Sequence, residues 1–319
     1  MKHSIDHLPH VTKEELNLIL SLIHHYVKDA NMVILYGSYA CDTYVLWDER
    51  YEYGVHTSYQ SDYDILVVIS NLNAKITEEI LRHKLTDTYH RYFSARRHAT
   101  PRFIVENIKT LNQHLECSQY FFTEIVRDGI LLYDDKQFEL ATPRFLDYAE
   151  IKDFAEYEFE RYYPTAVSLL DSVSCFFLKH NDFMNSAFVL HQACEKFYYV
   201  ILLVWMNYRP KNHKLDELSA MVKGFSRELS AVFPKDTPEA IRCYDLLCSA
   251  YIDARYNKDF IATRSQLEYL VSRVEYLKEV TGRICREKLA YYQSMIHKPA
   301  IYPLPEEGRI KAADDTDEK

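Results

Sequence analysis

The sequence predicts an α+β protein in which a small mixed sheet with flanking helices is followed by an all-α helical bundle. Strand-like apolar runs alternate with helix-like segments up to about residue 145, and beyond that point only helical spacing of apolar residues remains. We therefore expect an N-terminal domain over 1–145 and a helical domain over 146–297. A proline-bearing, acidic tail over 298–319 is expected to be disordered.

The first half opens with a helix and then alternates strands and helices. Thr12 and Glu15 have the spacing of a capping box, so we expect a helix from Thr12 to about Asp29. The polar and aromatic stretch 41–60 interrupts the pattern, and we expect it to form an inserted loop or hairpin. Apolar and β-branched runs predict four strands, at 32–36, 63–70, 101–108 and 130–134. Helical spacing predicts two more helices, at 77–93 and 110–129.

The second half carries no strand pattern. Pro210 and Pro234 fall between its predicted helices, where helix-breaking residues belong. The apolar stripes of the second and last helices predict core or oligomer surfaces, so a homo-oligomer formed through this half is one expectation. Apolar spacing predicts five helices, near 150–180, 183–207, 213–231, 236–255 and 264–296.

Composition excludes several classes of protein. The net charge of −9 and the pI near 5.9 argue against a broadly basic protein that binds DNA non-specifically. The longest apolar run, at 198–206, is shorter than the ~20 residues needed to span a membrane, and the N-terminus lacks the apolar core of a signal peptide. The seven cysteines form no CxxC pair. We expect free thiols in a cytoplasmic protein with no membrane attachment and no zinc site.

One Gly-Ser pair follows the first predicted strand directly. Gly37 lets the backbone approach a phosphate closely, because it has no side chain. The N–H groups that follow it, at the start of an expected helix, and the Ser38 hydroxyl can then donate hydrogen bonds to phosphate oxygens. Gly-Ser is common in loops, so the meaning of the pair depends on what the next strand contributes.

The next strand begins with two aspartates. Asp62 and Asp64 are two residues apart, so in a strand their side chains point to the same face. Two carboxylates placed side by side repel each other and raise one pKa unless a cation lies between them. Mg²⁺ is such a cation, since it takes oxygen ligands from one or two carboxylates and from substrate phosphates. The alternative interpretation is that the two aspartates are solvent-exposed residues at the start of the strand.

The segments "GSYA" at 37–40 and "SDYDILV" at 61–67 together resemble the signature of the nucleotidyltransferase superfamily related to DNA polymerase beta, especially its minimal bacterial members. In that family the Gly-Ser pair holds the triphosphate of the nucleotide, and acidic residues bind the catalytic metal ions. The family also has a third carboxylate on a later strand, and Glu106 is the acid on the strand expected at 101–108. The alternative for Glu106 is a surface charge on an edge strand. The resemblance implies Gly37 and Ser38 for nucleotide binding, and Asp62, Asp64 and Glu106 for catalysis and Mg²⁺ binding.

The match departs from the family pattern in two places. Minimal members usually read "GSxARG", whereas this chain reads "GSYACD" and lacks the arginine. The 23 residues between Ser38 and Asp62 also exceed the usual gap, which the insertion at 41–60 explains. The aromatic residues of that insertion are candidates to stack on a base or an acceptor, with ordinary packing of the loop as the alternative; they are Trp47, Tyr51, Tyr53 and Tyr59.

The helical half carries a second resemblance. The segments 186–218 and 251–260 are similar to a HEPN domain, a helical module often fused to or paired with minimal nucleotidyltransferases. Many HEPN members are ribonucleases that use an arginine and a histidine four to six residues apart, whereas Arg209 and His213 enclose only three. One interpretation is therefore a nucleotide or anion site, and another is a set of polar residues that cap and bridge helices; the residues are Arg209, Lys211, His213, Arg255 and Tyr256.

Together these patterns predict an enzyme that moves an NMP group from a nucleoside triphosphate to an acceptor hydroxyl with Mg²⁺, the helical half completing the cleft. The acceptor is a small molecule, a protein tyrosine or a tRNA end. Two alternatives stay open: a HEPN ribonuclease fused to an antitoxin-like nucleotidyltransferase domain, and a silent nucleotide-binding module.

The basic stretch 94–102, with three arginines, is a further candidate for phosphate or RNA contact, or else a solvated loop. His191 and Gln192 are expected to form a hydrogen-bonded core pair.

Overall fold

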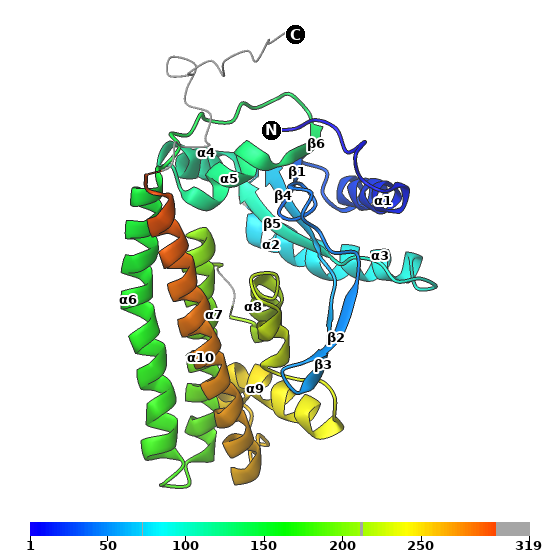
Figure 1. Ribbon diagram of the computed structural model, residues 1–319. Coiled ribbons are helices and arrows are strands. Elements are labelled where there is room, and N and C mark those ends of the chain that lie inside the picture. Colours follow the sequence, from blue (N-terminus) through cyan, green and yellow to red (C-terminus); the bar gives the residue numbers. More distant parts are fainter. Residues whose placement is uncertain (72, 211–212, 298–319) are drawn as a thin grey trace.

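The computed structural model describes residues 1–71, 73–210 and 213–297 (Figure 1). The tail expected at 298–319 and the candidate residue Lys211 lie outside the described residues. The described part consists of a mixed sheet with helices on both faces, followed by a bundle of long helices. The α+β fold class is confirmed, while the domain limits at 145 and 297 stay predictions.

Four strands form the sheet, in the order β5-β4-β1-β6. β4 runs parallel to β5, and β1 runs antiparallel to both of its neighbours, β4 and β6. All four strands expected from the sequence are present. Their bounds are Ala30–Tyr36 for β1, Tyr63–Ile69 for β4, Pro101–Asn107 for β5 and Ile130–Asp134 for β6.

The helices of this half differ from the prediction in their ends. Thr12 is buried inside α1 and is not its N-cap, because the helix begins two residues earlier, after Pro9. The helix expected at 77–93 is a continuous run of α2, a π-helical turn η1 and α3, and the one expected at 110–129 is divided by residues 117–119. The bounds are His10–Tyr26 (α1), Ala74–Ile80 (α2), Leu81–Leu85 (η1), Thr86–Tyr92 (α3), Ile108–Glu116 (α4) and Tyr120–Asp128 (α5).

Each face of the sheet is closed by its own helices. Ile65 and Val105 face a core formed with α1, η1 and α3, whereas Leu66 and Ile104 face a core formed with α4 and α5. Figure 1 shows these two groups of helices on opposite sides of the sheet. Side chains alternate between the two faces along each strand, so Asp64, two residues before Leu66, shares the face of α4 and α5.

The insertion at 41–60 forms a hairpin, which is one of the two forms expected from the sequence. Its strands are β2 (Asp48–Glu52) and β3 (Val55–Tyr59). Buried Ser61 closes its base, because its N–H donates to Val45 O at 2.9 Å and its Oγ accepts from Val45 N at 2.9 Å. The chain therefore leaves the Gly37 turn, makes the hairpin and returns to the head of β4 beside the point where it left.

The second half is helical, as predicted. Its central helix, α7, is buried along most of its length between α6 and α10. By length and hydropathy α7 is the one described helix that could cross a membrane, and 78% of its most apolar window is buried inside the protein. The bounds are Tyr148–Ser172 (α6), Val173–Phe177 (η2), Phe183–Met206 (α7), Leu215–Val222 (α8), Arg227–Ala231 (η3), Pro238–Tyr256 (α9) and Arg264–Met295 (α10).

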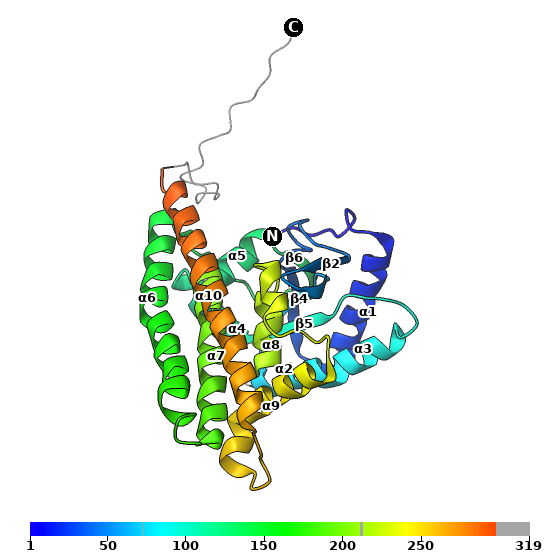
Figure 2. The ribbon, with the colours of Figure 1, turned by 60° about the horizontal axis from the view of Figure 1, so that its bottom comes forward.

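A break in the predicted helix 213–231 brings the two halves together. Instead of one helix the chain makes α8 and η3, joined by residues 223–226. Figures 1 and 2 both show α8 between the bundle and the sheet. Arg227 of η3 pairs with Asp48 and Glu52 of the hairpin, so the hairpin is fixed to the helical half as well.

Candidate active site

The turn after β1 lies against the head of β4. Tyr36, the last residue of β1, is paired with Asp64, and Gly37 follows with a φ of +73°. A Cβ placed on Gly37 would lie 2.5 Å from Asp64 Oδ2, closer than any side-chain carbon can approach. The glycine is therefore required both for its left-handed backbone and for the space that the Asp64 carboxylate occupies.

Asp62 is neutralised by two cations. Arg102 of β5 donates to its carboxylate through Nη2, and Lys223 Nζ lies 3.0 Å from Oδ2. Only 9% of the Asp62 side chain is exposed. Arg102 also donates through Nη1 to Ala220 O in α8, at 2.5 Å. The carboxylate thus joins the sheet to the C-terminal end of α8.

Asp64 has a different electrostatic environment. Burial raises the pKa of Asp64 from its ordinary value of 3.8 to about 7, and the charge of Asp62 adds to the rise. The positive charges of Arg102 and Lys223 act in the opposite direction. A carboxylate with such a pKa is partly protonated at neutral pH, and an added cation would favour its ionised form.

Glu106 does not join the two aspartates. It lies on the same face of the sheet, but it is level with Val68, whereas Arg102 is level with Asp64. Four residues of strand separate Glu106 from Arg102, a distance of ~13 Å. Glu106 is buried, so the edge-strand surface charge is wrong as well. The register therefore corrects the expectation of a third carboxylate, because it brings a cation to that position.

These residues fit one magnesium ion better than two. Mg²⁺ is commonly held by one or two carboxylates that share it with substrate phosphates, and Asp62 and Asp64 provide that number. Among the described residues, no group of three His, Cys, Asp or Glu side chains is arranged to hold a metal ion. A centre with three carboxylates for two ions does not fit this site.

The segment after Gly37 is a series of turns. Cys41 N donates to Gly37 O at 3.1 Å, and Thr43 N donates to Ser38 O at 2.9 Å. The helix expected there is absent from residues 37–47, so a helix dipole does not contribute. Ser38 is half-buried. A phosphate at this place would meet turn N–H groups and the Ser38 hydroxyl.

A second polar cluster lies in the helical half, centred on Glu195 of α7. His213 Nδ1 lies 2.5 Å from Glu195 Oε1, and the His213 ring stacks on Tyr251 with ring centroids 5.2 Å apart. Glu195 is buried, whereas about half of the His213 side chain is exposed. His191 lies deeper, with Nδ1 2.8 Å from Leu247 O and Nε2 3.2 Å from His213 O. Burial lowers the pKa of His191.

The other cationic candidates surround this cluster. The Arg255 guanidinium lies over the Tyr251 ring at 4.4 Å, and that of Arg209 lies over the Tyr199 ring at 4.9 Å. His213 precedes α8 and Lys223 follows it, so about 12 Å of helix separates the two polar sites. The structure therefore groups Arg209, His213 and Arg255 apart from the Gly37 turn. Nucleotide binding by that group stays a prediction.

Two residues of the first site were not assigned to it from the sequence. Arg102 appeared only within the basic stretch 94–102, although aligning the starts of β4 and β5 would have placed it level with Asp64. Lys223 carried no local signal, since a helix was expected through it. The remaining arginines of the basic stretch have other roles: Arg96 pairs with Glu15 at 3.0 Å, and Arg97 lies over the Trp47 ring at 3.5 Å.

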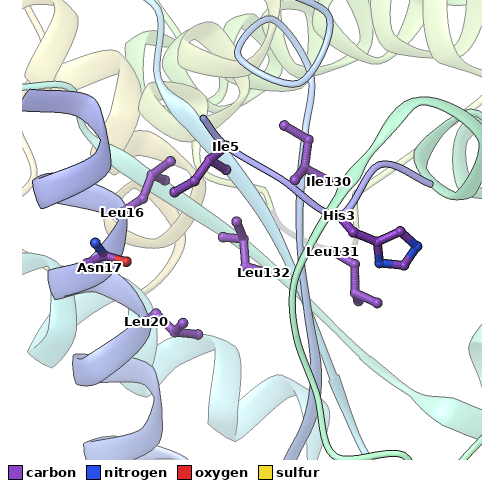
Figure 3. Close-up of a pocket in the computed structure, with 8 residues that line it drawn as sticks. All are labelled: His3, Ile5, Leu16, Asn17, Leu20, Ile130, Leu131 and Leu132. Carbon is purple, nitrogen blue, oxygen red and sulfur yellow. The ribbon is translucent and has the colours of Figure 1, made fainter. Parts of the chain in front are cut away.

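Among the cavities of the described residues, two are lined by residues other than the carboxylate pair. The smaller, of about 100 Å³, lies against α1 (Figure 3), on the opposite face of the sheet from Asp64. The larger, of about 310 Å³, lies beside the segment that follows Lys223. It is lined by Trp205, Phe225, Ser226, Arg283, Ile284, Glu287, Lys288 and Tyr291.

Comparison with known proteins gives two findings. A search of solved structures gives spectinomycin adenyltransferase AAD(9) from Enterococcus faecialis, determined with ATP and spectinomycin. The match has 13% identity and a TM-score of 0.27, and it covers 82% of this chain and 99% of that one. With so low a TM-score, the assignment of the sheet half rests on the geometry of its own residues.

The comparison with curated proteins gives no match. The model of the HEPN domain family matches residues 170–284, from the end of α6 through most of α10. This match includes both segments on which the resemblance was based. The helical half of this chain therefore contains a HEPN domain.

Proposed function

We propose that the chain is a nucleotidyltransferase that uses Mg²⁺ and acts at the junction of the Gly37 turn, β4 and α8. The observation that supports it most strongly is the close approach of Gly37 and Asp64, beside the Asp62 carboxylate that Arg102 contacts. A buried carboxylate against a glycine turn has no structural benefit by itself, because its pKa is raised and its burial is costly. It is explained by a ligand that adds positive charge there.

The residues divide the work of phosphoryl transfer between them. Ser38 and the N–H groups of its turn bind the triphosphate, while Lys223, which lies 3.0 Å from Asp62 Oδ2, adds positive charge to the site. Asp62 and Asp64 would hold Mg²⁺, which supplies charge neutralisation for the phosphate oxygens when bound. The acceptor hydroxyl gives up its proton to water, and its oxygen forms a bond to the α-phosphorus. The bond between the α-phosphorus and the oxygen that bridges it to the β-phosphorus breaks, and pyrophosphate leaves with that oxygen. Positioning and charge carry the reaction, so no nucleophilic side chain is required.

The cavity of about 310 Å³ favours a small hydroxylated acceptor over a protein or a tRNA end. Its volume falls at the lower limit of typical small-molecule sites. Phe225 and Ser226 line it, and they follow Lys223 by only two and three residues. The lining of the cavity therefore includes the segment that follows Lys223, whose Nζ lies 3.0 Å from Asp62 Oδ2. The seven free cysteines agree with a cytoplasmic enzyme.

The test is transfer of label from ATP, GTP, CTP or UTP, each labelled at the α-phosphate, in the presence of Mg²⁺ and a cell lysate. Asp64→Asn should lower transfer by about 100-fold or more, because it removes a charge that acts at the reacting phosphate. Asp87→Asn, which changes an exposed aspartate of α3, is the matched control and should transfer as the native chain does. Equal transfer by Asp64→Asn would falsify the proposal.

A HEPN ribonuclease is the second candidate, and the contact between Glu195 and His213 favours it. A histidine that is held by a buried carboxylate and half-exposed to solvent has the arrangement of a general base. The test is cleavage of total RNA by the full chain without nucleotide. RNA cleavage that His213→Ala abolishes and Asp64→Asn leaves intact would support this candidate over the first.

A further inference from the structure

The position on β5 that faces the carboxylate pair carries a cation. Strand register aligns Tyr36, Asp64 and Arg102 in one row across β1, β4 and β5. Level residues of parallel strands point to the same face, so Arg102 is the β5 side chain nearest to Asp64 on that face. A further acid on β5 that served this site would have to stand at or next to this row. Glu106 stands ~13 Å along the strand.

Arg102 is held in place from two directions. One nitrogen of its guanidinium donates to the Asp62 carboxylate, and another donates to Ala220 O in α8. About a fifth of the side chain is exposed. A planar guanidinium with two fixed acceptors keeps one orientation. Arg102 is therefore a permanent part of the site.

The charges at the site already balance. Asp62 and Asp64 bring two negative charges when ionised, and Arg102 and Lys223 bring two positive charges. One divalent ion that enters with the four negative charges of a nucleoside triphosphate leaves a net charge of about −2. A site with a carboxylate in place of Arg102 would need a second divalent ion to reach the same net charge, so Arg102 replaces one divalent ion in the charge balance. A second divalent ion would have to lie beside the first on the same two carboxylates, next to the two cations that already touch Asp62, and like charges at 3–4 Å repel strongly in a buried site.

We infer that the Arg102 guanidinium occupies the place of a third metal-binding carboxylate, so that the site takes a nucleoside triphosphate with one divalent ion and not two. This inference rests on the proposed function and assigns its metal requirement. Arg102 is a positioning residue here: it holds Asp62 beside Asp64 and supplies charge where a second ion would otherwise be needed.

The experiment counts bound metal. The full chain is titrated with Mn²⁺ in the presence of the α,β-methylene analogue of ATP, and in parallel that of GTP, while electron paramagnetic resonance measures free Mn²⁺. The native chain should bind one nucleotide-dependent Mn²⁺. Arg102→Glu should bind two, because it places a third carboxylate in the row. Arg102→Gln should still bind one, about tenfold more tightly, since Asp62 loses a competing cation.

Arg91→Glu, which makes the same charge change on the exposed surface of α3, is the control and should match the native chain. If Arg102→Glu does not fold, the native count and Arg102→Gln decide the matter. Two Mn²⁺ on the native chain would overturn the inference and leave the proposed function standing, as would an affinity for Mn²⁺ that Arg102→Gln does not raise. A folded Arg102→Glu that binds only one would do the same. Absence of any nucleotide-dependent Mn²⁺ on the native chain would instead count against the proposed function.

Discussion

The two polar sites of this chain are built in different ways. At the head of β4, strand register determines which side chains meet, so Tyr36, Asp64 and Arg102 form a row that follows from three neighbouring strands. Around Glu195, the partners come from the α7–α8 connection and from α9, where side chains meet because helices pack together. In the first site the Asp64 carboxylate is buried against the Gly37 turn, where its ionised form is unfavourable. The second pairs its carboxylate with a histidine.

That difference suggests that the first site is built for a ligand and the second contributes to stability. Burial raises the pKa of Asp64 to about 7, which is a cost to the folded protein whenever the group must be ionised. Glu195 is also buried, but its Oε1 lies 2.5 Å from His213 Nδ1, so the carboxylate has a polar partner. Substitutions at the two sites should therefore separate activity from stability.

The largest effect is expected from Gly37→Ala. Its Cβ would overlap Asp64 Oδ2, and a φ of +73° is unfavourable for alanine, so the carboxylate must move. A displacement of about 1 Å at a reacting centre lowers rates by ~100-fold, which the label-transfer assay would detect. Gly54→Ala is the matched control, because Gly54 has a φ of +75° and nothing within 4 Å of the added Cβ. It should cost about 1–2 kcal/mol of folding free energy and leave transfer intact. Equal losses of transfer in both variants would contradict the role assigned to the close approach of Gly37 and Asp64.

A smaller effect, on stability alone, is expected from His213→Ala. The change removes one partner of the buried Glu195 carboxylate and should lower the free energy of unfolding by about 1–2 kcal/mol, measured by urea denaturation. Nucleotide transfer should stay near the native rate, since about 12 Å of helix separates His213 from Lys223. His180→Ala, at an exposed histidine, is the control and should change stability by less than about 0.5 kcal/mol. Loss of transfer in His213→Ala with unchanged stability would reverse the roles assigned to the two sites.

The smallest effect concerns pH. Burial holds the pKa of His191 below its ordinary value of 6.5, so the unfolded chain takes up a proton that the folded chain excludes. The free energy of unfolding should therefore decrease as the pH falls below 6.5, and this part of the decrease should be missing in His191→Gln. Urea denaturation across this pH range is the measurement. Identical pH profiles for the native chain and His191→Gln would contradict the assignment.

Much of the fold and part of the site could be predicted from local patterns. Period-two and helical spacing placed the four strands and most of the helices, and the separation of two residues indicated that Asp62 and Asp64 are neighbours at the head of β4. The Gly-Ser pair after β1 gave its own signal, since only a glycine tolerates both the backbone and the close carboxylate. These features depend on neighbours within a few residues, which is why one sequence is enough to find them.

Contacts between distant segments could not be predicted in this way. Whether Glu106 or Arg102 faces the carboxylates depends on the alignment of β5 with β4, and a shift of four residues along a strand leaves the apolar pattern on the same face unchanged. Lys223 reaches Asp62 from 161 residues away because the chain breaks after α8 and the bundle packs against the sheet. Local periodicity therefore defined the elements and the aspartate pair, whereas packing between the two halves determined which charges complete the site.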